Sequence, residues 1–115
     1  MRLSPAKLAL SFIMLFATAG VQAAVNFDQW QKPQDAREFA RLDDKLPAVL
    51  SYFSQQSQQA LQQFYLQQLG EPTSQRQRYG QLELHYHQSQ QRIRIIISEQ
   101  QQWRQVDMMV LPASD

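Results

Sequence analysis

Alternation of strongly apolar residues with mostly polar ones in the C-terminal third of the chain is the feature that most constrains the fold. The apolar members are Leu82, Leu84 and Tyr86, then Ile93, Ile95 and Ile97, then Val106, Met108 and Val110. Successive side chains of a β-strand point to opposite faces, so a period of two predicts strands with one buried face. Short polar connections at 88–91 and 99–102 then predict two consecutive hairpins in an antiparallel meander.

The two predicted turns, centred on 89–90 and on 100–101, together define a register for the meander. The expected cross-strand partners are His87 with Arg92, His85 with Arg94, Arg94 with Asp107, Ile95 with Val106, and Ile93 with Met108. Both turns place the strong apolar residues on one face. A slip of one residue would move them to the other face, so the agreement of two turns favours the meander.

A helix is predicted over 55–69, immediately before the meander. Leu61, Phe64, Tyr65 and Leu69 follow the spacing of one helical face, and glutamine fills the other positions. Ser54 is the expected N-cap, and Gly70 with a proline beyond it is a typical helix stop. Elsewhere the many glutamines are interpreted as solvent-facing residues rather than as an aggregation-prone tract.

A second, shorter helix is predicted over 35–45. Asp35 and Glu38 have the spacing of a capping box, and Ala36, Phe39 and Leu42 share one helical face. Residues 48–53 form a short apolar run that fits either a strand or a helix, and we take it as a strand. Together these elements predict an α+β, two-layer domain over 35–112. A short N-terminal helix and one main amphipathic helix would pack on an antiparallel meander of three to four strands.

The N-terminal residues 1–23 have the pattern of a cleavable signal peptide. Arg2 and Lys7 precede an apolar run, and Val21-Gln22-Ala23 has small or short residues at the positions that a signal peptidase reads. The apolar run is about half the ~20 residues of a spanning helix, so no stable membrane insertion is expected after cleavage. The expected location is the periplasm, with residues 24–34 forming an irregular arm anchored by Phe27 and Trp30.

The charge of the predicted mature chain argues against a nucleic-acid partner. Removing Arg2 and Lys7 from the eleven basic residues leaves nine against ten acidic residues, a net charge of −1. Such a chain has no strong positive field to attract a polyanion. The absence of cysteine excludes a disulfide framework in so small a domain, which favours support from a partner or a second copy.

Catalytic and cofactor signatures are lacking, so no cofactor and no enzymatic activity are expected. One constellation suggests metal chemistry: Glu83, His85 and His87 alternate along a predicted strand, so their side chains share one face. The register sets arginines beside both histidines, and fixed positive charge opposes a bound cation. A small exported metal-binding protein or enzyme that uses these three residues is therefore the alternative hypothesis.

The predicted sheet face opposite the helix contains a group of residues suited to binding. These residues are Trp103, Arg94, Asp107, Met109 and Ile96. Aromatic and apolar groups on an otherwise polar face can mark an interaction surface, although the arm at 24–34 could instead fold across them. The first hypothesis is a non-enzymatic periplasmic accessory protein that binds a protein or small ligand here. A third is an envelope-assembly component that is stable only as an oligomer.

Overall fold

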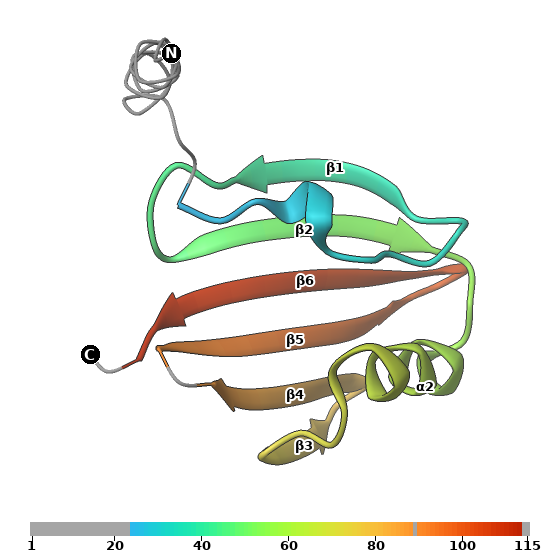
Figure 1. Cartoon of the computed structure of the whole chain (residues 1–115). Coiled ribbons are helices and arrows are strands. Elements are labelled where there is room, and N and C mark those ends of the chain that lie inside the picture. Colours follow the sequence, from blue (N-terminus) through green and yellow to red (C-terminus); the bar gives the residue numbers. More distant parts are fainter. Residues whose placement is uncertain (1–23, 89, 114–115) are drawn as a thin grey trace, which may run out of the picture.

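The fold is a single antiparallel sheet of six strands with one α-helix on one of its faces (Figure 1). The computed structural model describes residues 24–88 and 90–113, so the predicted signal peptide lies outside the described residues. The elements are η1 (Phe27–Gln29), β1 (Arg37–Leu42), β2 (Ala48–Ser54), α2 (Gln58–Leu69), β3 (Ser74–Arg78), β4 (Gln81–Gln88), β5 (Gln91–Gln100) and β6 (Trp103–Pro112). No helix in the described ranges is long and apolar enough to cross a membrane.

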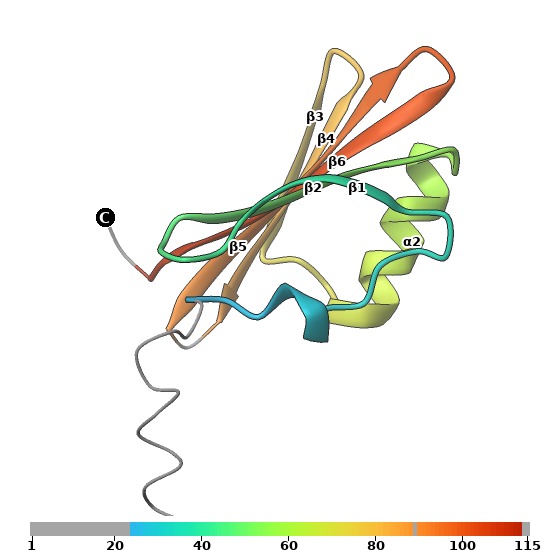
Figure 2. The same ribbon diagram turned by 90° about the horizontal axis from the view of Figure 1, so that it is seen from above.

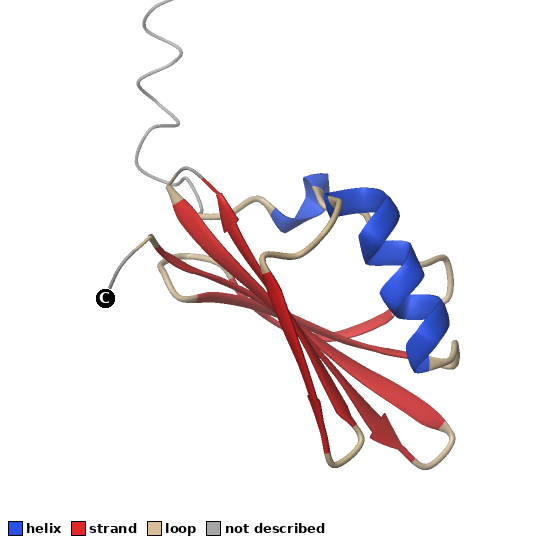
Figure 3. Cartoon of the chain, turned by 90° about the horizontal axis from the view of Figure 1, so that it is seen from below, coloured by secondary structure: helices blue, strands red, loops and turns tan. Residues whose placement is uncertain are grey.

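The strand order β1-β2-β6-β5-β4-β3 shows how the chain builds the sheet from its two edges. β1 and β2 form one hairpin, and α2 then carries the chain to the far edge, where β3 begins. The meander β3-β4-β5-β6 returns from that edge until β6 pairs with β2. The helix is therefore the crossover between the two halves of the sheet, and it lies over one face only (Figures 2 and 3).

The core lies between that face and the two segments that cover it. Alternate residues of the four inner strands point into it and are buried, among them Leu50, Leu84, Ile95 and Met108. The helix contributes Leu61 and Tyr65, which are 0% and 1% exposed. The N-terminal arm contributes Phe27, also 0% exposed, with Trp30 packed against the core. The arm thus covers the helix side of the sheet, and the opposite, open face is not covered by it.

The predicted fold class is wrong, because the molecule is mostly β and not a helix packed on a meander of three to four strands. Residues 37–42 form the edge strand β1 instead of a helix. The supposed apolar face of that helix is not buried, since Phe39 is 49% and Leu42 65% exposed. The run at 48–53 is a strand, β2, as expected.

Asp35 explains why the helical signal at 35–45 fails. Its carboxylate accepts hydrogen bonds from Ser54 Oγ at 2.8 Å, from the Gln55 backbone N–H at 2.8 Å and from Gln56 Nε2 at 3.2 Å. It therefore binds the end of β2, twenty residues away, instead of capping its own segment. Burial raises the pKa of Asp35, but the hydrogen bonds from Gln55, Ser54 and Gln56 outweigh it and hold that pKa below its usual value.

Asp35→Ala is expected to lower the free energy of unfolding by about 1–2 kcal/mol at neutral pH, since it removes several charge-assisted hydrogen bonds. A carboxyl with a lowered folded-state pKa stabilises the fold above its unfolded pKa, and this stabilisation is lost as the pH falls through the folded value. Urea melts at pH 7 and near pH 3 should therefore show the two proteins converging in acid. Asp44→Ala is the control, because Asp44 is also exposed but makes no side-chain hydrogen bond within the described residues; an equal loss there would contradict a specific role for Asp35.

The main helix is shorter at its start than predicted. It begins at Gln58, and the N-cap is Ser57, whose Oγ accepts from the Ala60 backbone N–H at 3.0 Å. Ser54, the expected cap, is instead engaged by Asp35. The C-terminal end agrees with the prediction: Gly70 is the C-cap with φ +84°, and its N–H donates to the Leu66 carbonyl.

The register of the first predicted hairpin is confirmed and that of the second is wrong. His85 lies opposite Arg94, and His87 opposite Arg92. Across the next turn, however, Arg94 faces Met109 and Ile96 faces Asp107, because the turn is Gln101–Gln102 with Gln100 opposite Trp103. This is a slip of two residues, which leaves every side chain on its predicted face.

Candidate binding surface

The five residues predicted as a binding surface all lie on the open face, and all are half-buried. They do not form one site. Ile96, Asp107 and Ser51 share a row across three strands, and Asp107 is occupied there, since Ser51 Oγ donates to it at 2.6 Å and Gln105 Nε2 at 3.2 Å. Trp103 lies beyond this row, next to the β5–β6 turn.

An aromatic cluster surrounds Trp103. The Phe39 and Phe53 rings are stacked, with centroids 4.4 Å apart, and the Phe53 ring meets the Trp103 ring edge-on at 6.3 Å. The Arg37 guanidinium lies 5.6 Å from the centre of the Trp103 ring, a cation–π contact. Sequence reasoning identified only Trp103, because Phe53 joins it through the pairing of β2 with β6, and Phe39 and Arg37 join through the pairing of β1 with β2.

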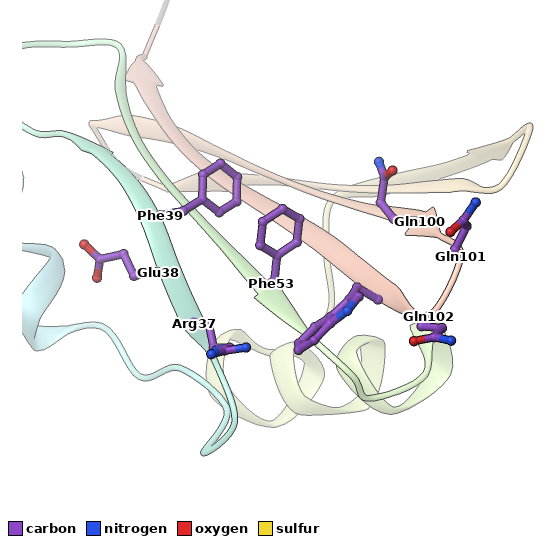
Figure 4. Close-up of a pocket in the computed structure, with 8 residues that line it drawn as sticks. Arg37, Glu38, Phe39, Phe53, Gln100, Gln101 and Gln102 are labelled. Atoms are coloured by element: carbon purple, nitrogen blue, oxygen red, sulfur yellow. The ribbon is translucent and has the colours of Figure 1, made fainter.

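A groove of about 600 Å³ opens along this cluster. We call it the aromatic groove; it is lined by Arg37, Glu38, Phe39, Phe53, Gln100, Gln101, Gln102 and Trp103. In Figure 4, Phe39 and Phe53 lie beside each other on neighbouring strands, and the three glutamines line the opposite side at the β5–β6 turn. The groove therefore combines aromatic faces with neutral amides that can donate and accept hydrogen bonds.

A β-bulge determines which side chains of β1 enter the groove. Arg37 faces Phe53 and Glu38 faces Tyr52, but the register then shifts so that Ala40 faces Ser51. The extra residue is Phe39, which joins the open face while Glu38 and Arg41 both turn to the helix side. Bulges commonly redirect a side chain at a sheet edge, and here the result is a half-exposed ring beside Phe53.

The same bulge puts the charged side chains of Glu38 and Arg41 on the helix side of β1 and leaves that of Arg37 on the groove side. On the helix side, Arg41 donates to Glu38 at 2.8 Å and to Asp28 at 2.9 Å, and the hydrogen bond from Arg41 is the main cause that lowers the pKa of Glu38. On the groove side, no carboxylate of the described residues lies within 4 Å of the Arg37 guanidinium. The groove is therefore a locally positive, aromatic surface.

The residues of the metal hypothesis lie on β4, on the same open face. Glu83 Oε1 and His85 Nε2 are 3.1 Å apart, and Arg94 lies opposite His85 on β5. Within residues 24–88 and 90–113, no three histidine, cysteine or acidic side chains are placed to hold a metal ion. The geometry is that of a hydrogen-bonded pair beside fixed positive charge, which gives the metal hypothesis no support.

Comparison with known proteins found no match to a family model, to a curated protein or to a solved structure. The open face itself is therefore the basis for inferring what the chain does.

Proposed function

We propose that the chain is a small exported, non-enzymatic interaction protein that holds another envelope protein on its open sheet face. The observation that supports this most is the aromatic groove, whose Phe39 ring is 49% exposed although it is stacked on Phe53. Aromatic residues and arginine dominate the energetics of protein interfaces, and here three rings and Arg37 converge in one concavity.

The charges of the groove favour one kind of occupant. Arg37 is the cation that faces it, and the Glu38 carboxylate is held by Arg41 on the other side of the strand. The complementary partner is a protein segment that places an apolar or aromatic side chain on Phe39 and Phe53 and an aspartate or glutamate beside Arg37. The amides of Gln100 to Gln102 would bond to the backbone of such a segment.

Selection of a displayed random-peptide library on the purified chain tests this proposal. The expected outcome is enrichment of peptides in which an aromatic or aliphatic residue lies near an acidic one. Trp103→Ala and Arg37→Gln should each weaken binding of the enriched peptides by about tenfold or more, as expected for hot-spot residues. Trp103→Ala should cost far less folding stability than a core substitution, because the side chain is only half-buried.

Tyr79→Ala is the matched control, since Tyr79 is an aromatic residue that is 99% exposed and lies outside the groove. Its binding should equal that of the unmodified chain. Peptides that bind Trp103→Ala unchanged would contradict the proposal. So would a stable dimer, measured by light scattering, that Trp103→Ala dissociates, because the groove would then hold a second copy of the chain.

A further inference from the structure

A second concavity lies on the open face at the other end of β5, and it differs in chemistry from the aromatic groove. The aromatic groove is next to the β5–β6 turn, whereas this cleft is next to the end of β4 and the start of β5. The cleft has a volume of about 190 Å³. The lining residues with charged, imidazole or aliphatic hydroxyl side chains are Thr73, Ser74, His85, His87, Arg92 and Arg94. These six residues supply two guanidinium groups, two imidazoles and two hydroxyls; Tyr86, Ile93 and Leu111 complete the lining, and none of these nine described residues carries a carboxylate.

Arg94 is the residue that gives the cleft its chemistry. Its Nε is buried and has no hydrogen-bond partner among the described residues. A buried polar group without a partner costs free energy, and in a native fold it calls for an explanation. A guanidinium has five N–H donors in a planar fork, which matches the oxygens of an anion.

The nearby carboxylates of Glu83 and Asp107 have other partners and do not pair directly with Arg94. Glu83 lies 3.1 Å from His85 Nε2, and Asp107 accepts from Ser51 and Gln105. The direct neighbours of Arg94 across the sheet are His85 and Met109. In the part of the chain that the structure describes, no carboxylate comes within 4 Å of the Arg94 guanidinium.

Further donors approach the cleft from the segment that leads into β3 and from the start of β3. The Thr73 hydroxyl accepts from the His87 backbone N–H at 3.1 Å, which leaves its own O–H able to donate. Ser74 lies directly opposite His85 on the neighbouring strand. Together with the guanidinium of Arg94 on β5, these two hydroxyls suit a tetrahedral oxyanion, with several acceptor oxygens, better than a planar carboxylate with two.

We propose that this cleft binds a phosphate group, with the Arg94 guanidinium as its principal ligand and the hydroxyls of Thr73 and Ser74 as further donors. The volume supports a single small group, since pockets that enclose drug-sized ligands measure about 300–1,000 Å³. The phosphate is either free in solution or the monoester of a lipid headgroup, and the chemistry at Arg94 is the same for both. This site is independent of the aromatic groove.

The test is an NMR titration of the isotope-labelled chain with inorganic phosphate at constant ionic strength, with chloride as the reference anion. Saturable shifts of the Thr73, Ser74, His85 and Arg94 amides are expected. Arg94→Gln should weaken binding about tenfold or more, and Arg94→Lys, which keeps the charge but loses the fork, should weaken it less. Arg78→Gln, on β3 and outside the cleft, is the matched control and should bind as the unmodified chain does.

Vesicles distinguish the two sources. Co-sedimentation with vesicles that contain phosphatidic acid, but not with phosphatidylcholine alone, and its loss in Arg94→Gln, would identify a lipid monoester. Phosphate binding in solution without vesicle binding would identify a free phosphate. Shifts that fail to saturate, or that are equally weakened by Arg78→Gln and Arg94→Gln, would overturn the proposal, provided that thermal melts show both variants folded.

Discussion

Phe27→Ala is expected to lower the free energy of unfolding by about 3–5 kcal/mol, the usual range for removing a buried aromatic ring. Phe27 belongs to neither the sheet nor the main helix, yet its side chain is 0% exposed. Its ring meets the Trp30 ring edge-on at 5.5 Å, and Asn26 fixes the local turn by accepting from the Asp28 backbone N–H. The arm is therefore part of the core, and urea unfolding followed by circular dichroism would measure its contribution.

Phe39→Ala is the matched control, because it removes the same side chain from the open face. Phe39 is 49% exposed, so its loss should cost only about 1 kcal/mol, mainly the stacking on Phe53. Equal losses in the two variants would mean that the open face is buried in solution. A loss below about 0.5 kcal/mol in Phe27→Ala, as for surface substitutions, would mean that the arm does not pack on the helix side.

The strands that sequence reasoning could find are those with one buried and one open face. Buried apolar residues of β4, β5 and β6 recur at every second position, because each of these strands lies inside the sheet with the core on one side. β3 has no such pattern, since all five of its residues are exposed. An edge strand that buries nothing leaves no hydrophobic period in the sequence, and the extent of the sheet was missed for that reason.

The misassignment of β1 has a different physical cause. The capping-box spacing of Asp35 and Glu38 is a genuine local preference, but both carboxylates are used by distant or unforeseen partners. Asp35 binds the end of β2, and Glu38 binds Arg41 across the bulge. Tertiary pairing with β2 overrides the local preference, and no pattern within residues 35–45 reports that pairing.

The exact position of the second hairpin turn could not be predicted, because the sequence there repeats one residue type. Gln100, Gln101 and Gln102 are identical, so the sequence does not distinguish a turn centred on 100–101 from one centred on 101–102. The structure has the latter, with Gln101 at φ +38°, as two-residue hairpin turns require. The predicted faces of the strands are nevertheless correct, so the prediction puts Trp103 on the correct face of the sheet. Its partners Phe39 and Arg37 could not be placed beside it from the sequence, because they reach Trp103 only through the pairing of β1 with β2.

Raising the pH above 10 is expected to destabilise the protein through Tyr52 and Tyr65. Their hydroxyls are 2.7 Å apart in the core, and Tyr65 also donates to Met108 Sδ. Burial raises the pKa of both phenols above the ordinary value of 10.0. The folded state thus keeps two protons that the unfolded chain releases, so the stabilisation is complete below pH 10 and is lost as the pH rises. By pH 11 the loss should reach about 3 kcal/mol, or about 1.4 for each tyrosine.

Denaturant melts between pH 8 and 11 measure this loss, and two variants separate its causes. The double variant Tyr52→Phe, Tyr65→Phe lacks both titrations, so its stability should fall much less steeply above pH 10, although Tyr86, whose pKa burial also raises, leaves a residual slope. Tyr79→Phe removes a phenol that is 99% exposed and should leave the pH profile unchanged. An unchanged slope in the double variant would contradict the buried pair as the cause. A slope flattened equally by Tyr79→Phe would place the sensitivity in exposed phenols.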